Sequence, residues 1–114
     1  MLPQAFRLRK EKEIKGVLQR AKTRKSGLLV CKTAANNLDA VRFCFIVSKK
    51  ISNKAVVRNK LKRRLRAIVQ KFLPNAILGY DCLLIACPGL QKTTFGELES
   101  TVKKALESSN IIKL

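Results

Sequence analysis

The residues best suited to chemistry in this chain of 114 residues are its cations, which gather in one stretch. Between Lys49 and Lys71 there are ten lysines and arginines and no acidic residue. Lysine is a compact positive charge, and arginine presents a planar fork of donors that fits a phosphate in a bidentate manner. The chemistry that this stretch offers is therefore phosphate binding. The cations are Lys49, Lys50, Lys54, Arg58, Lys60, Lys62, Arg63, Arg64, Arg66 and Lys71.

The charge of the whole chain agrees with this interpretation. The formal net charge is +18, from 25 lysines and arginines against 7 acidic residues. Such a chain repels itself and attracts polyanions, so nucleic acid is the expected partner. Solubility alone does not require charge of one sign. A membrane surface is an alternative, but no apolar run approaches the roughly 20 residues of a spanning helix, and residues 1–15 lack the apolar segment of a secretory signal. We expect a cytoplasmic protein with no membrane partner.

The protein lacks the residues of an ordinary nuclease. It contains no histidine, the usual general acid and base near neutral pH, and a Ser or Cys nucleophile would lack an obvious base. The acidic residues are scattered, without the spacing of metal ligands. The four cysteines form no C-x-x-C pair, so we interpret them as reduced thiols in apolar runs. We therefore predict no catalytic residue and no metal ligand. The cysteines are Cys31, Cys44, Cys82 and Cys87.

Most of the cations of residues 49–71 lie within residues 55–72, which have the pattern of an amphipathic helix. Six apolar side chains fall within about 120 degrees of arc, while like charges at i and i+4 repel one another without a nearby acid. The counter-charge must then come from outside, as phosphates. Ser52 or Asn53 is the expected N-cap, and Pro74 ends the helix. The apolar positions are Val57, Leu61, Leu65, Ile68, Val69 and Phe72.

The flanking segments predict a platform for this helix. Residues 11–21 have helical spacing, and residues 28–34 and 41–50 are β-rich runs separated by a turn, which predicts an antiparallel hairpin. In the second run, Phe43, Phe45 and Val47 share one face, opposite Ser48. The apolar run 81–87 predicts an interior strand. A final helix follows a capping box formed by Thr94 and Glu97, and its apolar stripe is Leu98, Val102, Ala105 and Leu106.

The predicted order is α-β-β-α-β-α, in a single RNA-binding domain that spans residues 1–114. A strand, a helix and a strand in series require a crossover, which makes the second and third strands parallel. General rules predict a right-handed crossover. The fold class is α+β, a sandwich with helices packed on a mixed sheet and one face of that sheet partly uncovered.

Composition leaves the kind of nucleic acid open. DNA is not the expected partner, because no second helix directly precedes the basic helix as a support for major-groove binding. A charge-rich helix on a sheet suits structured RNA better, since such RNA is bound through shape and backbone. A structural RNA-binding protein, such as a ribosomal protein, fits the charge equally well.

A more specific signal lies in the segment VSKKISNKAVVRNKLKRRLR, residues 47–66. It resembles the signature region of the protein subunit of bacterial ribonuclease P, with its strand end V-S-[KR]-K and its helix start A-V-x-R-N-R-x-K-R-x-x-R. Residues 7–22 and 81–89 resemble two further motifs of that family, in the same order. Lys60 stands where the family usually has arginine. The matching residues are Val47, Ser48, Lys49, Lys50, Ala55, Val56, Arg58, Asn59, Lys62, Arg63 and Arg66.

The resemblance implies a bacterial ribonucleoprotein hydrolase of tRNA processing. Ribonuclease P is an endonuclease that removes the 5′ leader of precursor tRNA, its catalyst is an RNA that positions Mg²⁺ ions, and its protein assists substrate and Mg²⁺ binding. The family fold has a left-handed crossover, contrary to the general rule, and we adopt that version. The residues expected to bind the catalytic RNA are Lys49, Lys50, Lys54, Arg58, Asn59, Lys60, Lys62, Arg63, Arg64 and Arg66.

The resemblance also implies a cleft for the single-stranded leader between the first helix and the open sheet face. Two helix positions that carry Phe in the family are Ile14 and Leu18 here, a Tyr of the first strand corresponds to Cys31, and the Arg before the Pro-Gly turn is Cys87. With Ser48, these residues make up the expected leader cleft. Because stacking of a base on an aromatic ring contributes about 1–3 kcal/mol, we expect weaker leader contacts here.

Overall fold

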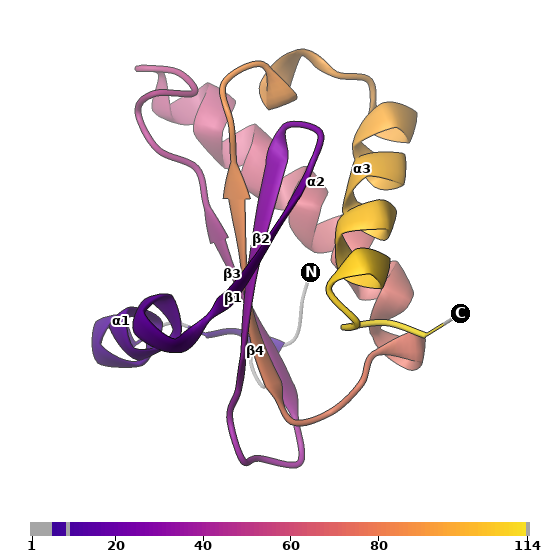
Figure 1. Ribbon diagram of the computed structural model, residues 1–114. Coiled ribbons are helices and arrows are strands. Elements are labelled where there is room, and N and C mark those ends of the chain that lie inside the picture. Colours follow the sequence, from indigo (N-terminus) through magenta and orange to yellow (C-terminus); the bar gives the residue numbers. More distant parts are fainter. Residues whose placement is uncertain (1–5, 9, 114) are drawn as a thin grey trace.

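One mixed sheet of four strands forms the centre of the computed structural model, which describes residues 6–8 and 10–113 (Figure 1). The strands are β1 (Lys22–Ser26), β2 (Leu29–Ala35), β3 (Val41–Ile46) and β4 (Tyr80–Ala86), in the spatial order β1-β2-β4-β3. β1 pairs antiparallel with β2, and β2 antiparallel with β4, whereas β3 and β4 are parallel. Residues 1–5, 9 and 114 lie outside the described residues. They include part of residues 1–15, for which the sequence predicted no secretory signal.

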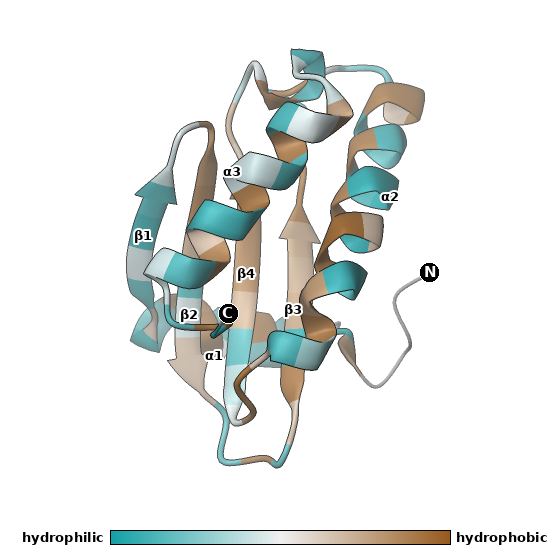
Figure 2. Cartoon of the chain, turned by 90° about the vertical axis from the view of Figure 1, so that its right-hand side faces the viewer, coloured by the Kyte–Doolittle hydropathy of each residue, from teal (hydrophilic) through white to brown (hydrophobic). Residues whose placement is uncertain are grey.

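Helices cover the two faces of the sheet unequally. α2 (Ala55–Phe72) and α3 (Phe95–Ser108) lie side by side on one face, as Figure 2 shows, and α1 (Glu11–Arg20) lies on the other. The larger hydrophobic core fills the space under α2 and α3, and a smaller cluster of Leu8, Val17, Ala34 and Leu83 lies under α1. The expected α+β fold class is confirmed, and so is the partial covering of one face.

The expected hairpin between residues 28–34 and 41–50 is wrong, because β4 lies between β2 and β3. Cys82, Leu83 and Leu84 have no exposed surface, and a strand buried on both faces belongs inside a sheet. The residues between β2 and β3 surround the start of β4. Gly79 N donates to Ala40 O at 2.8 Å, and Asn36 N donates to Gly79 O at 2.9 Å.

A further strand, β1, was missed by the sequence pattern. Its sequence KTRKS has no apolar alternation, and four of its five residues are exposed. β1 forms the edge of the sheet by a tight turn to β2, in which Gly27 adopts a positive φ of 57°. A glycine tolerates this left-handed conformation without steric cost. The element order is therefore α-β-β-β-α-β-α.

The crossover from β3 through α2 to β4 is left-handed. Both strands point upward in Figure 1, and in Figure 2, viewed from the α2 side, β4 lies to the left of β3. The right-handed prediction from general rules is wrong here, and the left-handed one is confirmed. The left-handed crossover results from the face of the sheet on which α2 packs. Val41, Phe43 and Phe45 make the more apolar side of β3, so α2 packs there, while β4 must still lie next to β2.

The helix ends follow the sequence closely, with one exception. The capping box of α3 is formed, since Glu97 N donates to Thr94 Oγ1 at 3.2 Å and Thr94 N donates to Glu97 Oε1 at 3.0 Å. α2 ends at Phe72, and Pro74 belongs to the short 3₁₀ turn η2 (Leu73–Asn75). The expected N-cap of α2 is wrong: Lys54 is the N-cap, and the Ser52 hydroxyl instead accepts from Lys54 N.

Arg42, whose side chain is 18% exposed, ties α1 to the sheet. The Arg42 guanidinium donates from Nε and Nη2 to the two carboxylate oxygens of Asp81, at 2.9 and 2.8 Å, and from Nη1 to Glu13 Oε2 at 2.9 Å. Asn36 Nδ2 donates to the same Asp81 carboxylate. Hydrogen bonds from Arg42 to Asp81 raise the pKa of the guanidinium above its usual value. The network therefore joins β3, β4 and α1.

Replacing Asp81 by Asn should destabilise the fold by about 3 kcal/mol, because it leaves a largely buried guanidinium without its main counter-charge. The midpoint of urea unfolding measures the change. The matched control is Glu99→Gln, which breaks the more exposed ion pair with Lys71 and should cost less than about 1 kcal/mol. Equal effects of the two substitutions would contradict this role of Asp81.

Candidate nucleic-acid interface

The apolar side of α2 fixes the helix to the sheet and to α3. Leu61, Leu65, Ile68 and Val69 are at most 3% exposed and belong to the main core. The two outer members of the predicted stripe, Val57 and Phe72, are half-buried. The rest of the helix surface is left to its polar side chains.

Most cations of residues 49–71 remain available to an external partner. Among the described residues, only Lys71 of this set forms an ion pair, with Glu99 Oε1 at 2.9 Å. Lys49, Lys50, Lys54, Asn59, Lys60, Arg63 and Lys71 are exposed, and Arg58, Lys62, Arg64 and Arg66 are half-buried. A dense set of cations without acids destabilises the free protein and favours the binding of a polyanion.

The outward side of α2 carries a shallow depression. Its lining is Asn59, Lys62, Arg63, Ala67 and Arg66. The four polar residues stand at i, i+3, i+4 and i+7, so one helix face brings their donors together. Three cations and an amide around one hollow can hold several phosphate oxygens at once.

Arg58 has an internal partner, which the sequence did not indicate. Its Nη1 donates to Ser52 O at 2.8 Å, so this guanidinium holds the segment between β3 and α2. Gln91 lies in the 3₁₀ turn η3 (Leu90–Lys92), and its Nε2 donates a hydrogen bond to Ile51 O, the carbonyl before that of Ser52, at 3.0 Å. Ile51 itself is 5% exposed. The segment that carries Lys49, Lys50 and Lys54 is thus anchored from two elements.

The uncovered part of the sheet offers a second surface. Val30, Ile85 and Ile46 are neighbours across three strands and are half-buried, and α1 covers only the lower part of this face (Figure 1). Leu18 on α1 is 43% exposed, whereas Ile14 is half-buried against the smaller core cluster. All five side chains are aliphatic, so this surface is an apolar floor beside a helix.

Ser48 and Cys87 continue the strands at the upper end of this surface. Ser48 lies two residues beyond Ile46 and is exposed, and Cys87 lies two residues beyond Ile85 and is half-buried. Ser48 Oγ also accepts from Lys50 N at 3.3 Å. Both residues therefore lie just beyond the ends of β3 and β4, next to the upper end of this surface.

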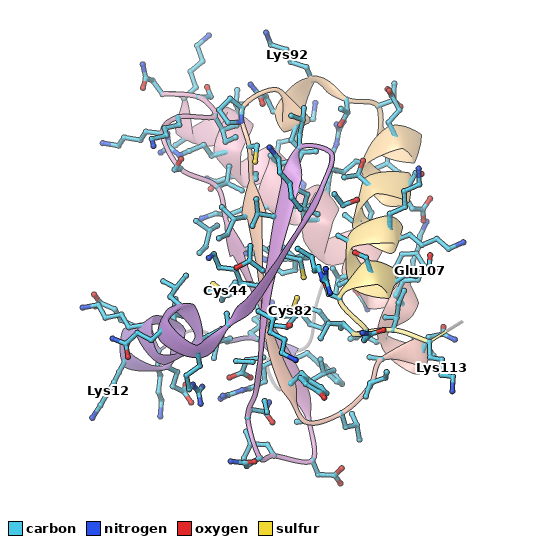
Figure 3. All side chains as sticks on the ribbon, in the orientation of Figure 1. Lys12, Cys44, Cys82, Lys92, Glu107 and Lys113 are labelled. Carbon is cyan, nitrogen blue, oxygen red and sulfur yellow. The ribbon has the colours of Figure 1, made fainter. Side chains whose placement is uncertain are left out.

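The placement of Cys31 in the leader cleft is wrong. Cys31 has no exposed surface and packs in the main core under α2 and α3, with Sγ at 3.3 Å from Cys82 Sγ. The hydrogen bond with Cys31, together with burial, raises the pKa of the Cys82 thiol well above its usual value, so this thiol stays protonated at neutral pH. Figure 3 shows Cys82 within the fold. On β2, the residues of the open face are Val30 and Lys32.

Arg66 connects the basic helix with the open face. Together with Ile14 and Cys44 it lines a small cavity at the edge of β3. Burial raises the pKa of the Cys44 thiol, and the positive charges of Lys62 and Arg66 oppose that rise. The two candidate surfaces therefore meet at this strand edge, and one bound RNA could contact both.

The described carboxylates do not form a metal site. Within residues 6–8 and 10–113, no three His, Cys, Asp or Glu residues gather closely enough to hold a metal ion. The best-buried carboxylate, Asp81, is already paired with Arg42.

Within residues 6–8 and 10–113, no helix is long and apolar enough to cross a membrane.

The chain is similar to proteins of known family. Residues 2–110 match the family model described as Ribonuclease P. The ribonuclease P protein component of Syntrophomonas wolfei is 36% identical over 99 residues, which cover 87% of this chain and 82% of that protein. The ribonuclease P protein component of Roseiflexus castenholzii is 31% identical over 113 residues, which cover 98% of this chain and 92% of the other.

Solved structures show the same fold. The RNase P protein of Thermotoga maritima, solved in complex with 1-(4-fluorophenyl)-2-thiourea, has a TM-score of 0.82 at 26% identity, over 89% of this chain and 97% of that one. The RNase P protein of Staphylococcus aureus has a TM-score of 0.88 at 23% identity, over 96% and 100% of the two chains.

Replacing Arg58 by Ala should loosen the segment between β3 and α2. A hydrogen bond from a charged donor contributes about 1.5–3 kcal/mol, so amide exchange at Ile51 and Lys54 should accelerate about tenfold or more. Hydrogen exchange followed by NMR measures this rate. Lys60→Ala, on an exposed residue of the same helix, is the control, and Arg58→Lys should restore part of the protection. Unchanged exchange in Arg58→Ala would contradict the anchoring role.

Proposed function

Because the chain belongs to the ribonuclease P protein family, we propose that α2 binds the catalytic RNA of the complex and that the open sheet face binds the single-stranded 5′ leader of precursor tRNA. Membership makes the chain the protein subunit of an endoribonuclease that processes tRNA and contains an RNA partner. The alternative of a structural RNA-binding protein, such as a ribosomal protein, is not favoured by the family match.

The observation that carries the proposal is the unpaired cationic surface of α2. Asn59, Lys62, Arg63 and Arg66 surround one depression, and none of the three cations has an ion-pair partner among the described residues. Backbone phosphates of a folded RNA supply the missing counter-charges. The buried stripe of α2 keeps the backbone that carries these donors in place, so only their side chains are ordered when the RNA binds.

The remaining cations extend this contact. Lys49, Lys50 and Lys54 lie on the anchored segment before α2. Lys60 and Arg64 lie on α2 itself, on the border opposite the depression. Arg58 contributes by holding Ser52 O and has further N–H donors for a phosphate. In this proposal the RNA follows the helix along its length and also contacts the preceding segment.

The leader part of the proposal depends on the chemistry of the open face. Unpaired bases can lie on the apolar floor of Val30, Ile46 and Ile85, beside the exposed Leu18, while Arg66 at the strand edge is available to a phosphate. Ile14, Ser48 and Cys87 border this floor. Since these side chains are not aromatic, contacts to the leader are weaker than stacking would provide.

We assign catalysis to the RNA partner and the Mg²⁺ ions chiefly to that RNA. The protein contains no histidine, and its described carboxylates do not gather into the oxygen-rich set that Mg²⁺ requires. The protein's own contribution is to hold the substrate and to neutralise phosphates, which also eases the approach of Mg²⁺. Its expected place of action is the cytoplasm.

Removing two cations from the depression should weaken binding of the catalytic RNA. In the variant Lys62→Gln/Arg63→Gln, the slope of log affinity against log salt should become shallower by about 1 for each lost phosphate contact. Filter binding of the cognate catalytic RNA across a salt series measures both quantities. The control Lys103→Gln/Lys104→Gln removes the same charge from exposed positions of α3 and should change the slope little.

Reconstituted cleavage tests the proposed function as a whole. The protein, the cognate catalytic RNA and a precursor tRNA are combined at low Mg²⁺, and removal of the 5′ leader is followed. The proposal requires that the protein raise substrate affinity or the rate of cleavage. A reaction that is no faster with the protein than without it would exclude the proposal.

An aromatic ring at Leu18 should strengthen the leader contact. Leu18→Phe places a stacking surface beside the open face, and a gain of about 1 kcal/mol corresponds to about fivefold tighter binding of precursor tRNA to the assembled complex. Mature tRNA, which lacks the leader, should bind unchanged. Gln19→Phe, on the adjacent exposed position of α1, is the control. An equal gain for precursor and mature tRNA would show that Leu18 does not face the leader.

A further inference from the structure

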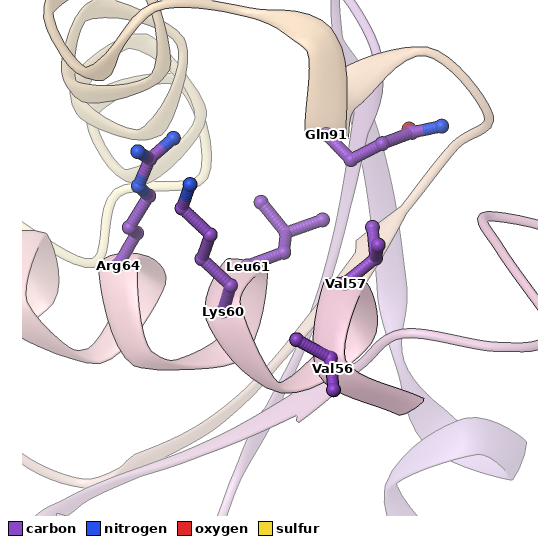
Figure 4. Close-up of a pocket in the computed structure, with 6 residues that line it drawn as sticks. All are labelled: Val56, Val57, Lys60, Leu61, Arg64 and Gln91. Atoms are coloured by element: carbon purple, nitrogen blue, oxygen red, sulfur yellow. The ribbon is translucent and has the colours of Figure 1, made fainter. Parts of the chain in front are cut away.

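A pocket lies on the opposite border of α2 from the depression, between the helix and η3 (Figure 4). Its floor is apolar. Leu61 is 3% exposed and Val57 is half-buried, while Val56 is 79% exposed and lies within the most basic part of the chain. The complete lining is Val56, Val57, Lys60, Leu61, Arg64 and Gln91.

The far wall of the pocket is held in place by hydrogen bonds. Gln91 Oε1 accepts from Gly89 N at 2.9 Å, and Gln91 Nε2 donates to Ile51 O at 3.0 Å. Leu90, next to it, is 1% exposed and anchors η3 in the core. Because both ends of the amide already have partners, Gln91 is fixed before any ligand binds. The wall is therefore preformed.

Two cations accompany the apolar floor. In Figure 4, Lys60 and Arg64 extend from α2 toward the side on which Gln91 lies. Neither forms an ion pair within the described part of the chain. The pocket thus joins an apolar surface to two positive charges, and a suitable ligand combines a flat apolar group with negative charge beside it.

We propose that this pocket binds one unpaired nucleotide of the catalytic RNA. The base lies against Val56, Val57 and Leu61, and Lys60 and Arg64 bind the phosphates on either side of it. Free phosphate would not use the apolar floor, and an uncharged apolar ligand would not use the cations, whereas single-stranded RNA supplies both groups. The floor offers no hydrogen bonds to base edges, so several bases fit.

This inference rests on the proposed function of α2 and extends it. The depression of Asn59, Lys62, Arg63 and Arg66 lies on the outward side of the helix, and the pocket lies on the border that faces η3. The catalytic RNA would therefore contact α2 on two sides. Phosphates alone would bind in the depression, whereas an extruded base would bind in the pocket.

The base contact can be detected directly by NMR of the methyl groups. An oligouridylate added to the full-length protein should shift the Val56, Val57 and Leu61 methyl resonances upfield, because the base ring current acts on groups that it covers. An abasic oligonucleotide of the same length and charge should leave these resonances in place. Equal methyl shifts with the two probes, or none with either, would overturn the proposal.

Substitution of Val56 provides an independent test with a matched control. Val56→Thr keeps the shape of the side chain but makes it polar, and it should weaken binding of the base-bearing oligonucleotide severalfold without affecting the abasic one. Val56→Ile keeps an apolar side chain and should bind like the unsubstituted protein. If both variants bind the base-bearing probe equally well, the pocket does not hold a base.

Binding of the catalytic RNA separates this proposal from the function on which it rests. If the unsubstituted protein binds the catalytic RNA and raises leader removal, yet Val56→Thr and Val56→Ile bind that RNA equally, only the pocket proposal fails. If the unsubstituted protein neither binds the RNA nor aids cleavage, the proposed function itself fails. A loss of affinity confined to Val56→Thr supports both.

Discussion

The central position of β4 is the constraint on which the other features of the molecule depend. Its run of apolar residues requires burial on both faces, so it lies between β2 and β3 and leaves β1 and β3 at the edges. The polypeptide must then pass over the sheet between β3 and β4, and α2 makes that passage on the more apolar face. The left-handed crossover follows from this combination of strand order and face.

The same arrangement divides the molecule into surfaces with separate physical roles. α2 buries one side in the core and exposes the other, so the backbone that carries its cations is fixed although those cations repel one another. The network of Arg42, Asp81 and Glu13 fixes α1 against the opposite face and leaves part of that face uncovered. Arg66 lies where the two surfaces meet. An RNA bound as proposed would meet an ordered backbone at both of them.

Much of the local structure was predictable because apolar residues repeat with a period of about 3.6 residues along an amphipathic helix. The bounds of α2, the capping box of α3 and the buried stripe from Leu98 to Leu106 all agree with the pattern. Strands were predicted less well. β1 is polar because it lies at an edge, so it lacked the apolar signal. Cys31 was placed in the cleft only because it was matched to a Tyr position of the resembled family, and its side chain lies in the main core instead.

The sequence by itself determined which segments are helical, where the cations lie on α2 and which side of that helix is apolar, because these properties arise among residues that are close along the chain. The tertiary structure alone decided the order of the strands, the face to which Cys31 points, and the partners of Arg58 and Gln91. It also formed the pocket, since Gln91 reaches Val57 only after β4 has returned the polypeptide to the start of α2. Such contacts join distant segments, and no local pattern encodes them.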